Sequence, residues 1–162
     1  MVKRSVFSGM ALLAFALLAI PAPSQGAGVK RLVINHSMAG IRPGDDVERL
    51  HRHLGKPKGI RYLQNEITGS MRADYYGKLA FYSHGGTILS MKTTRRSMRS
   101  RSGIHVGMTT RKLRRKLPGL SCYMPMCRIV AGGGSATIGR RVTSFRIRDG
   151  RVRFITIGNV ID

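Results

Sequence analysis

The stretch GIRPGDDVERLHRHL, residues 40–54, recurs 63 residues further along the chain as GIHVGMTTRKLRRKL, residues 103–117. Six of the 15 aligned positions are identical, and these are glycines, apolar residues and one arginine. Self-similarity at a fixed spacing is typical of a duplicated structural unit. The duplication therefore predicts architecture, and it names no ligand.

Each copy predicts a turn followed by a short helix. In the first copy Asp45 or Asp46 can cap the helix, and Glu48 stands three residues after Asp45, as in a capping box. In the second copy Thr109 is the expected cap. Apolar residues at helical spacing give each helix one face to bury: Val47, Leu50 and Leu54 in the first copy, Leu113 and Leu117 in the second.

Short β-prone segments follow each helix, at residues 73–76, 78–82, 87–93, 128–130, 141–148 and 151–157. Asp149-Gly150 is a strong signal for a two-residue hairpin turn. Apolar residues match at a spacing of 64, as Phe81 does with Phe145, so the duplication extends into the strands. We therefore expect an α+β fold of two tandem repeats in one compact unit. Each repeat, residues 28–94 and 95–162, would be a short helical segment packed on an antiparallel sheet.

The N-terminus has the three-part pattern of a secretory signal peptide over residues 1–27. Lys3 and Arg4 precede an apolar run at residues 9–20, and small residues suitable for cleavage follow that run. Twelve apolar residues are too few to span a bilayer comfortably, so no stable transmembrane segment is expected after cleavage. The alternative is an uncleaved N-terminal anchor. The pattern predicts a secreted or cell-envelope location.

The chain is strongly basic, and its charge is unevenly distributed. Without Lys3 and Arg4 it has 27 basic and 7 acidic residues, a net charge of +20. Residues 75–148 contain no Asp or Glu and 16 Lys or Arg. Repulsion among so many like charges destabilises a folded chain, and an anionic partner would offset it. The alternative is a solvated basic surface with no specific ligand.

Two groups of basic residues are candidates for anion binding. Across the predicted hairpin Arg148 would face Arg151 and Arg146 would face Arg153, on the side opposite a core that includes Phe145 facing Phe154. We call these four the hairpin arginines. The second group, the helix cations, lies on the second predicted helix and consists of Arg111, Arg114, Arg115 and Lys116. A third basic stretch, residues 92–102, is expected to be either a solvated linker or an ordered loop that binds an anion.

The two cysteines, Cys122 and Cys127, indicate a disulfide, as an isolated pair does in an exported chain. The five histidines form no metal-binding pattern, and His51 and His53 are two apart on a helix and do not converge. The acidic residues are scattered or explained by helix capping, and no catalytic motif is present. We therefore expect no enzyme activity, no metal and no cofactor.

The pattern Gly-x-x-x-x-x-Leu-x-x-x-Leu-Gly-x-Pro over residues 44–57 resembles the opening of SmpA/OmlA-like domains. Gly107-Met108-Thr109, followed by Leu113 and Leu117, is similar to it. Two such units in an exported chain resemble the β-lactamase-inhibitor-protein architecture. That resemblance implies a helix-loop-helix on an antiparallel sheet in each unit, with the two sheets forming a concave surface.

The sequence thus predicts a secreted, non-enzymatic binding module that contacts anionic cell-envelope polymers through a basic face. The alternative is a protein–protein interaction module, inhibitor-like or an envelope-assembly factor. Nucleic acid is not favoured, because the basic segments lack interleaved aromatic residues and the signal peptide directs the chain out of the cytoplasm.

Overall fold

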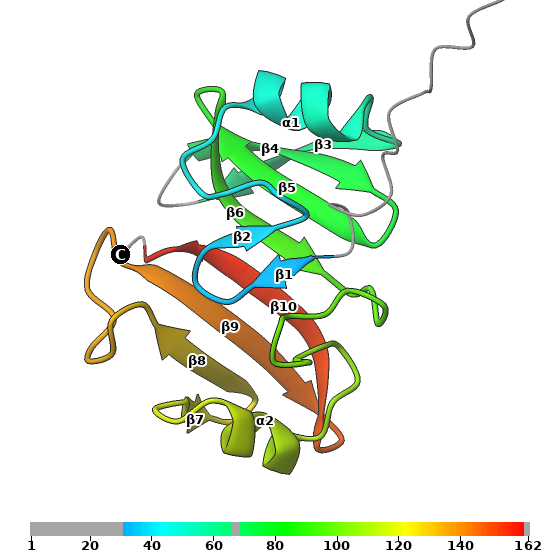
Figure 1. Ribbon diagram of the computed structural model, residues 1–162. Coiled ribbons are helices and arrows are strands. Elements are labelled where there is room, and N and C mark those ends of the chain that lie inside the picture. The colour runs from blue at the N-terminus through cyan, green and yellow to red at the C-terminus, as the bar shows by residue number, and fades with distance from the viewer. Residues whose placement is uncertain (1–30, 66–68, 161–162) are drawn as a thin grey trace, which may run out of the picture.

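The computed structural model describes residues 31–65 and 69–160 (Figure 1). The predicted signal peptide therefore lies outside the described residues. In chain order the elements are β1 (Leu32–Val33), β2 (Ser37–Met38), α1 (Val47–Leu54), β3 (Gly59–Asn65), β4 (Gly69–Tyr76), β5 (Leu79–His84), β6 (Thr87–Thr93), α2 (Thr110–Lys116), β7 (Ser121–Tyr123), β8 (Met126–Val130), β9 (Arg141–Arg148) and β10 (Arg151–Asn159).

Eight strands form one antiparallel sheet in the order β3-β4-β5-β6-β10-β9-β8-β7, while β1 and β2 form a small sheet of their own. Strands β3–β6 and β7–β10 are each a run of sequential neighbours. The two runs meet where β6 pairs with β10, from Thr93 opposite Ile155 to Ser90 opposite Gly158. In Figure 1 the sheet runs through the molecule from β3 near the top to β7 at the bottom.

The predicted fold class was wrong. The chain is mostly β, with one continuous eight-stranded sheet in place of two helix-on-sheet repeats. The helices have only eight and seven residues, too few to form a layer of their own. The sheets merge because β6 and β10 would otherwise be open edges with unpaired backbone groups, and pairing them satisfies those groups.

The duplicated sequence nevertheless produces the same backbone contact in two places. The Gly44 amide donates to the Ile88 carbonyl at 2.8 Å, and the Gly107 amide donates to the Val152 carbonyl at 2.8 Å. Both glycines have a positive φ, 95° and 94°, which residues with a Cβ rarely adopt. This contact ties the turn before each helix to the β5–β6 or the β9–β10 hairpin.

The predicted helix starts are confirmed, but Asp46 caps α1, so the expected capping box of Asp45 with Glu48 is not formed. The Asp46 side chain accepts a hydrogen bond from the Arg49 amide, and the Thr109 hydroxyl accepts one from the Lys112 amide at 3.4 Å. Gly55 ends α1 with a φ of 77°. The helices therefore begin where the capping residues place them.

The predicted strands at residues 87–93 and 141–148 are β6 and β9, and Asp149-Gly150 forms the expected turn. Both turn residues have a positive φ, 53° and 66°, as a type I′ turn requires. The strands β3 and β7 were not predicted.

The core lies on one face of the sheet. Phe81 pairs with Met91 across β5–β6, and Phe145 pairs with Ile155 across β9–β10, and all four are fully buried. Buried residues from the other elements pack in the same cluster: Leu32 and Met38 of the small sheet, Leu50 of α1, Met98 of the linker and Leu113 of α2. These elements therefore cover the same face of the sheet.

Candidate anion-binding surface

Carboxylates are concentrated around α1 and β4, where they already have basic partners. Of the six ion pairs among the described residues, five join Asp45, Asp46, Glu48 or Asp74 to side chains of α1 or β4. The sixth is a loose contact of 3.7 Å between Arg148 and Asp149. The second half of the chain therefore presents its arginines largely without carboxylate partners.

The hairpin arginines are all exposed, but a β-bulge changes their pairing. Arg148 lies opposite Arg151, as predicted, whereas Arg146 lies opposite Phe154. Arg153 is the extra residue of the bulge and has no partner in the strand register. The expected pairs Arg146–Arg153 and Phe145–Phe154 were therefore wrong, because the bulge shifts β10 by one residue.

The bulge also moves Phe154 off the core face. It is partly exposed beside Arg146, and the Lys92 ammonium lies 4.2 Å from its ring centroid. Arg61 lies 5.9 Å from the Tyr75 ring centroid in the same sheet. In both pairs the cation and the aromatic ring are distant from each other in the sequence and meet only in the folded sheet. Sequence reasoning missed both contacts.

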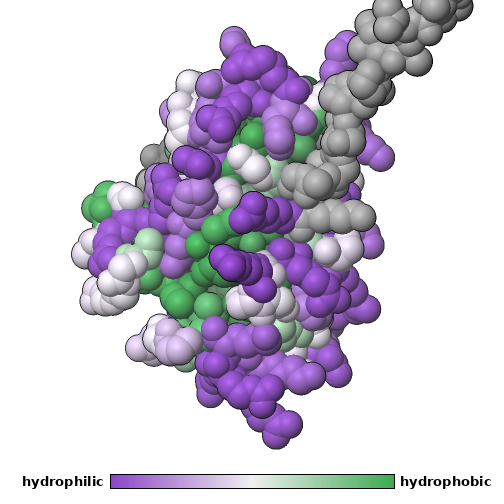
Figure 2. All heavy atoms as spheres, in the orientation of Figure 1, coloured by the Kyte–Doolittle hydropathy of each residue, from purple (hydrophilic) through white to green (hydrophobic). Residues whose placement is uncertain are grey.

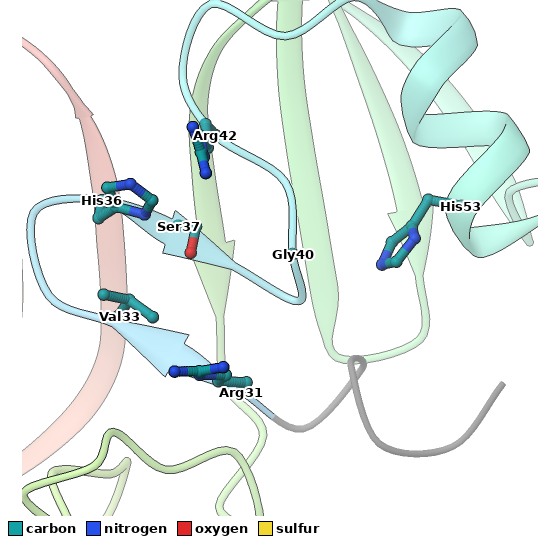
Figure 3. A pocket seen from close by; sticks show the side chains of 7 residues that line it. All are labelled: Arg31, Val33, His36, Ser37, Gly40, Arg42 and His53. Carbon is teal, nitrogen blue, oxygen red and sulfur yellow. The ribbon is translucent and has the colours of Figure 1, made fainter. Parts of the chain in front are cut away.

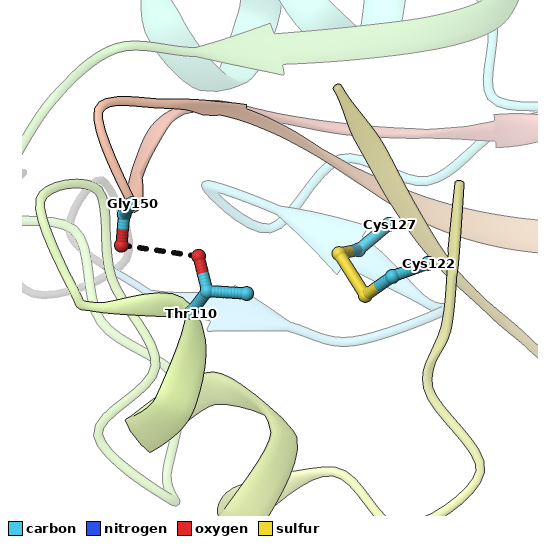
Figure 4. The surroundings of a disulfide bond; sticks show 4 residues. All are labelled: Thr110, Cys122, Cys127 and Gly150. Carbon is cyan, nitrogen blue, oxygen red and sulfur yellow. Dashed lines mark hydrogen bonds between the residues drawn. A yellow bond between two sulfur atoms is a disulfide. The ribbon is translucent and has the colours of Figure 1, made fainter. Parts of the chain in front are cut away.

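The helix cations lie beside the hairpin that carries the hairpin arginines. The Thr110 hydroxyl donates to the Gly150 carbonyl at 3.0 Å (Figure 4), and the Thr110 amide donates to the same oxygen at 2.9 Å. The four helix cations are exposed, and the Lys116 ammonium donates to the Ser102 carbonyl at 2.6 Å. The fold therefore joins the start of α2 to the tip of the β9–β10 hairpin, and we call the end of the molecule that carries both groups its basic end. Hydrophilic side chains lie over α2 at the bottom of Figure 2.

The stretch at residues 92–102 is ordered rather than a solvated linker. Met98 is fully buried, and the Leu32 amide donates to the Arg99 carbonyl at 3.1 Å. Thr93 is also buried. The backbone of the segment is therefore anchored to the small sheet and the core, while Arg96, Arg99 and Arg101 are exposed.

A hollow of about 490 Å³ lies between the small sheet and α1 (Figure 3). Basic side chains from three segments line it, namely Arg31, His36, Arg42 and His53. The pKa of His36 is lowered, chiefly by burial and then by the positive charges of Arg42 and Arg141. His36 therefore stays neutral more readily here than in water.

A buried carboxylate holds α1 on the sheet. Asp74 of β4 is 1% exposed and accepts from the Arg72 guanidinium at 2.7 and 3.2 Å. The His51 Nε2 lies 2.8 Å from the same carboxylate. Nearby, burial raises the pKa of Tyr76 to about 12, and the Asp74 charge contributes. Sequence reasoning missed this cluster because His51 and Asp74 are 23 residues apart.

The predicted disulfide is confirmed. Cys122 and Cys127 are bonded and lie directly opposite each other in β7 and β8 (Figure 4). Cys127 is fully buried in the core. The bond therefore joins the edge strand β7 to β8, whose Cys127 belongs to the core.

Within residues 31–65 and 69–160, no three His, Cys, Asp or Glu side chains are grouped so that they could hold a metal ion. Neither helix in this part of the chain has the length and apolar character that a membrane span requires.

No family model and no curated protein matches this chain. Two solved structures are similar at 11% identity. One is an extracellular protein containing an SCP domain from Bacillus anthracis, with a TM-score of 0.46 over 72% of this chain and 43% of that protein. The chain therefore spans less than half the length of that protein.

The other solved structure is described as a "putative beta-lactamase inhibitor protein" from Streptococcus mutans. Its TM-score is 0.33 over 74% of this chain and 85% of that one. Both TM-scores are below 0.5, so the SmpA/OmlA-like resemblance remains a prediction.

Proposed function

We propose that the protein is an exported, non-enzymatic binding module that contacts anionic polymers of the cell envelope through its basic end. The observation that supports this proposal is the distribution of ion pairs. Arginines of α1 and β4 have carboxylate partners, whereas the hairpin arginines share one loose contact with Asp149 and the helix cations have none among the described residues.

The geometry of the hairpin supports the same function. Arg148 and Arg151 face each other across β9 and β10, and like charges directly opposite are destabilising. An anion lying over the pair would remove this repulsion. The guanidinium group also suits bidentate contacts with phosphate or carboxylate oxygens. Export rests on the pattern at residues 1–27.

Retention on an anionic matrix tests the proposal. In one variant the four hairpin arginines are changed to Gln, and in the control Arg49 and Arg52, which already pair with Asp45, Asp46 and Glu48, are changed to Gln. We expect the hairpin variant to elute at clearly lower salt and the control to elute close to the wild type. Unaltered retention of the hairpin variant would show that these arginines do not form the binding surface.

A second candidate is a protein-interaction module, favoured by the exposed apolar residues of the edge strand β3. Ile60 is 46% and Tyr62 is 72% exposed there. An open edge strand can accept an extended segment of another protein as a further strand. Salt distinguishes the candidates, because anion binding weakens steeply as salt rises and apolar strand pairing does not.

A further inference from the structure

A second hollow, of about 290 Å³, lies where the segment before α2 crosses β10. Its lining comes from two separate parts of the chain, the segment before α2 and the start of β10. We call it the linker hollow, and it is lined by Arg96, Arg99, His105, Val106, Gly107 and Arg151. It thus combines one hairpin arginine with two arginines of the basic stretch at residues 92–102.

The walls of the linker hollow are held by backbone contacts. β6 ends at Thr93, opposite Ile155, so the start of β10 extends beyond it. At this part of β10, which β6 does not reach, the Gly107 amide donates a hydrogen bond to the Val152 carbonyl at 2.8 Å. The Arg151 guanidinium then donates to the Gly107 carbonyl at 3.2 Å. The hairpin and the linker are therefore fixed relative to each other.

Because Gly107 has no side chain, the Arg96 side chain can also lie in the linker hollow. A Cβ on Gly107 would lie 3.6 Å from the Nε of Arg96, so the Arg96 side chain runs directly past the bare glycine backbone. Two contacts position the backbone of Arg99. Its neighbour Met98 is fully buried, and its carbonyl accepts a hydrogen bond from the Leu32 amide. Arginines from two segments thus converge around one glycine.

Within residues 31–65 and 69–160, no carboxylate pairs with the positive charges that line the linker hollow. Among the described residues, Arg96, Arg99 and Arg151 make no ion pair, and the sequence contains no Asp or Glu between residues 75 and 148. Asp149, the acidic residue next along the chain, contacts Arg148 instead. Arg96, Arg99 and Arg151 are exposed, and their three positive charges around one small hollow repel one another, so an anion bound among them would relieve that repulsion.

The fourth polar side chain is His105. Its Nδ1 lies 2.8 Å from the Val106 carbonyl, which can only accept, so Nδ1 carries a proton. This bond fixes the orientation of the imidazole ring and leaves Nε2 available to a ligand. The polar groups around the linker hollow are therefore three donors of fixed positive charge and one oriented imidazole.

We propose that the linker hollow binds a single phosphate group, such as one that an anionic polymer carries. The inference rests on the proposed function and assigns the chemistry of the ligand. A tetrahedral phosphate has oxygens pointing in several directions and can contact guanidinium groups from both walls, whereas a planar carboxylate has two oxygens on one side. The volume accommodates one such group with part of the chain that carries it.

Calorimetric titration of the purified protein with inorganic phosphate tests the proposal. The test variant is Arg96→Gln with Arg99→Gln, and the control is Arg49→Gln with Arg52→Gln, which removes the same number of positive charges from the exposed surface of α1, outside the basic end. We expect saturable 1:1 binding by the wild type, a loss of roughly tenfold or more in the test variant, and little change in the control. Thermal unfolding of each variant verifies that it is folded.

Equal weakening in both variants, or no saturable binding by the wild type, would overturn the phosphate site. Retention on a polyglycerol phosphate matrix and on a polyglutamate matrix separates this result from the proposed function. If the wild type is retained on both matrices but does not bind phosphate, the phosphate site is refuted and the proposed binding through the basic end is still supported. If the wild type binds phosphate but is retained on neither matrix, the phosphate site is supported and polymer binding is refuted.

Discussion

Gly158 lies in the seam where β6 and β10 join the two halves of the sheet, directly opposite Ser90. A Cβ added at Gly158 would lie 2.8 Å from the Ser90 Cβ and 3.2 Å from the Leu89 carbonyl oxygen. Neither atom can rotate away, because one is bonded directly to the backbone and the other belongs to it. The methyl group of an alanine can therefore be accommodated only if the strands move apart.

Overpacking of this kind costs about 1–3 kcal/mol. We expect Gly158→Ala to lower the free energy of unfolding by that amount, and the Tm by roughly 3–10 °C for a domain of this size. The control is Gly59→Ala in β3, where no heavy atom lies within 4 Å of the added Cβ. There we expect stability to be unchanged or raised by about 0.4–1 kcal/mol.

Urea unfolding followed by circular dichroism measures both variants. Adding Ser90→Gly to Gly158→Ala removes the nearest contact and should recover part of the loss, which a double-mutant cycle would register as coupling between the two sites. If Gly158→Ala and Gly59→Ala unfold at the same urea concentration, the seam is not closely packed, and the single continuous sheet would be in doubt.

Three further predictions concern the disulfide, the buried carboxylate and the tyrosine near it. Replacing Cys122 and Cys127 with Ala should leave a folded protein that is less stable by about 2 kcal/mol, because the closed loop is short; reactive thiols in the denatured, unreduced wild type would refute the bond. Asp74→Ala should cost about 2–3 kcal/mol in urea unfolding by leaving Arg72 without its carboxylate, and a loss below about 1 kcal/mol would refute that role. The folded protein holds the Tyr76 proton more tightly than the unfolded chain, so stability should fall as pH rises from about 10 towards about 12. Tyr76→Phe should make this fall shallower, and an identical pH profile would contradict it.

Features coded by neighbouring residues could be predicted from the sequence. The caps Asp46 and Thr109 and the Asp149-Gly150 turn each depend on a few adjacent positions, and all three are found where expected. The disulfide is also local, because its two cysteines face each other across one short hairpin. In these cases the local chemistry is sufficient to determine the structure.

Features that depend on distant contacts could not be predicted. The bulge at Arg153 accompanies a second set of hydrogen bonds from Val152 to the segment before α2, which strand alternation cannot reveal. β3 buries none of its residues at positions 59–64, so its sequence shows no alternation, and it becomes a strand by pairing with β4. The joining of β6 to β10 likewise depends on two edges that are far apart in the chain.

The sequence predicts which residues form the candidate surface, but the structure changes how they pair across the strands. Strand alternation across the Asp149-Gly150 turn predicts the hairpin arginines and charge predicts the helix cations, and the fold joins α2 to that turn. Arg96 and Arg99 were singled out only as part of a basic stretch. Their convergence with Arg151 depends on the crossing of β10 by Gly107, which no local pattern indicates.

Binding of the purified protein to polyglycerol phosphate, measured over a range of salt concentrations, tests most directly whether the hairpin arginines bind the anion. The wild type should lose affinity steeply as salt rises, with a linear relation between the logarithms of affinity and salt concentration. The variant with all four hairpin arginines changed to Gln should bind more weakly and with a clearly shallower slope. The same affinity and slope for wild type and variant would contradict the account.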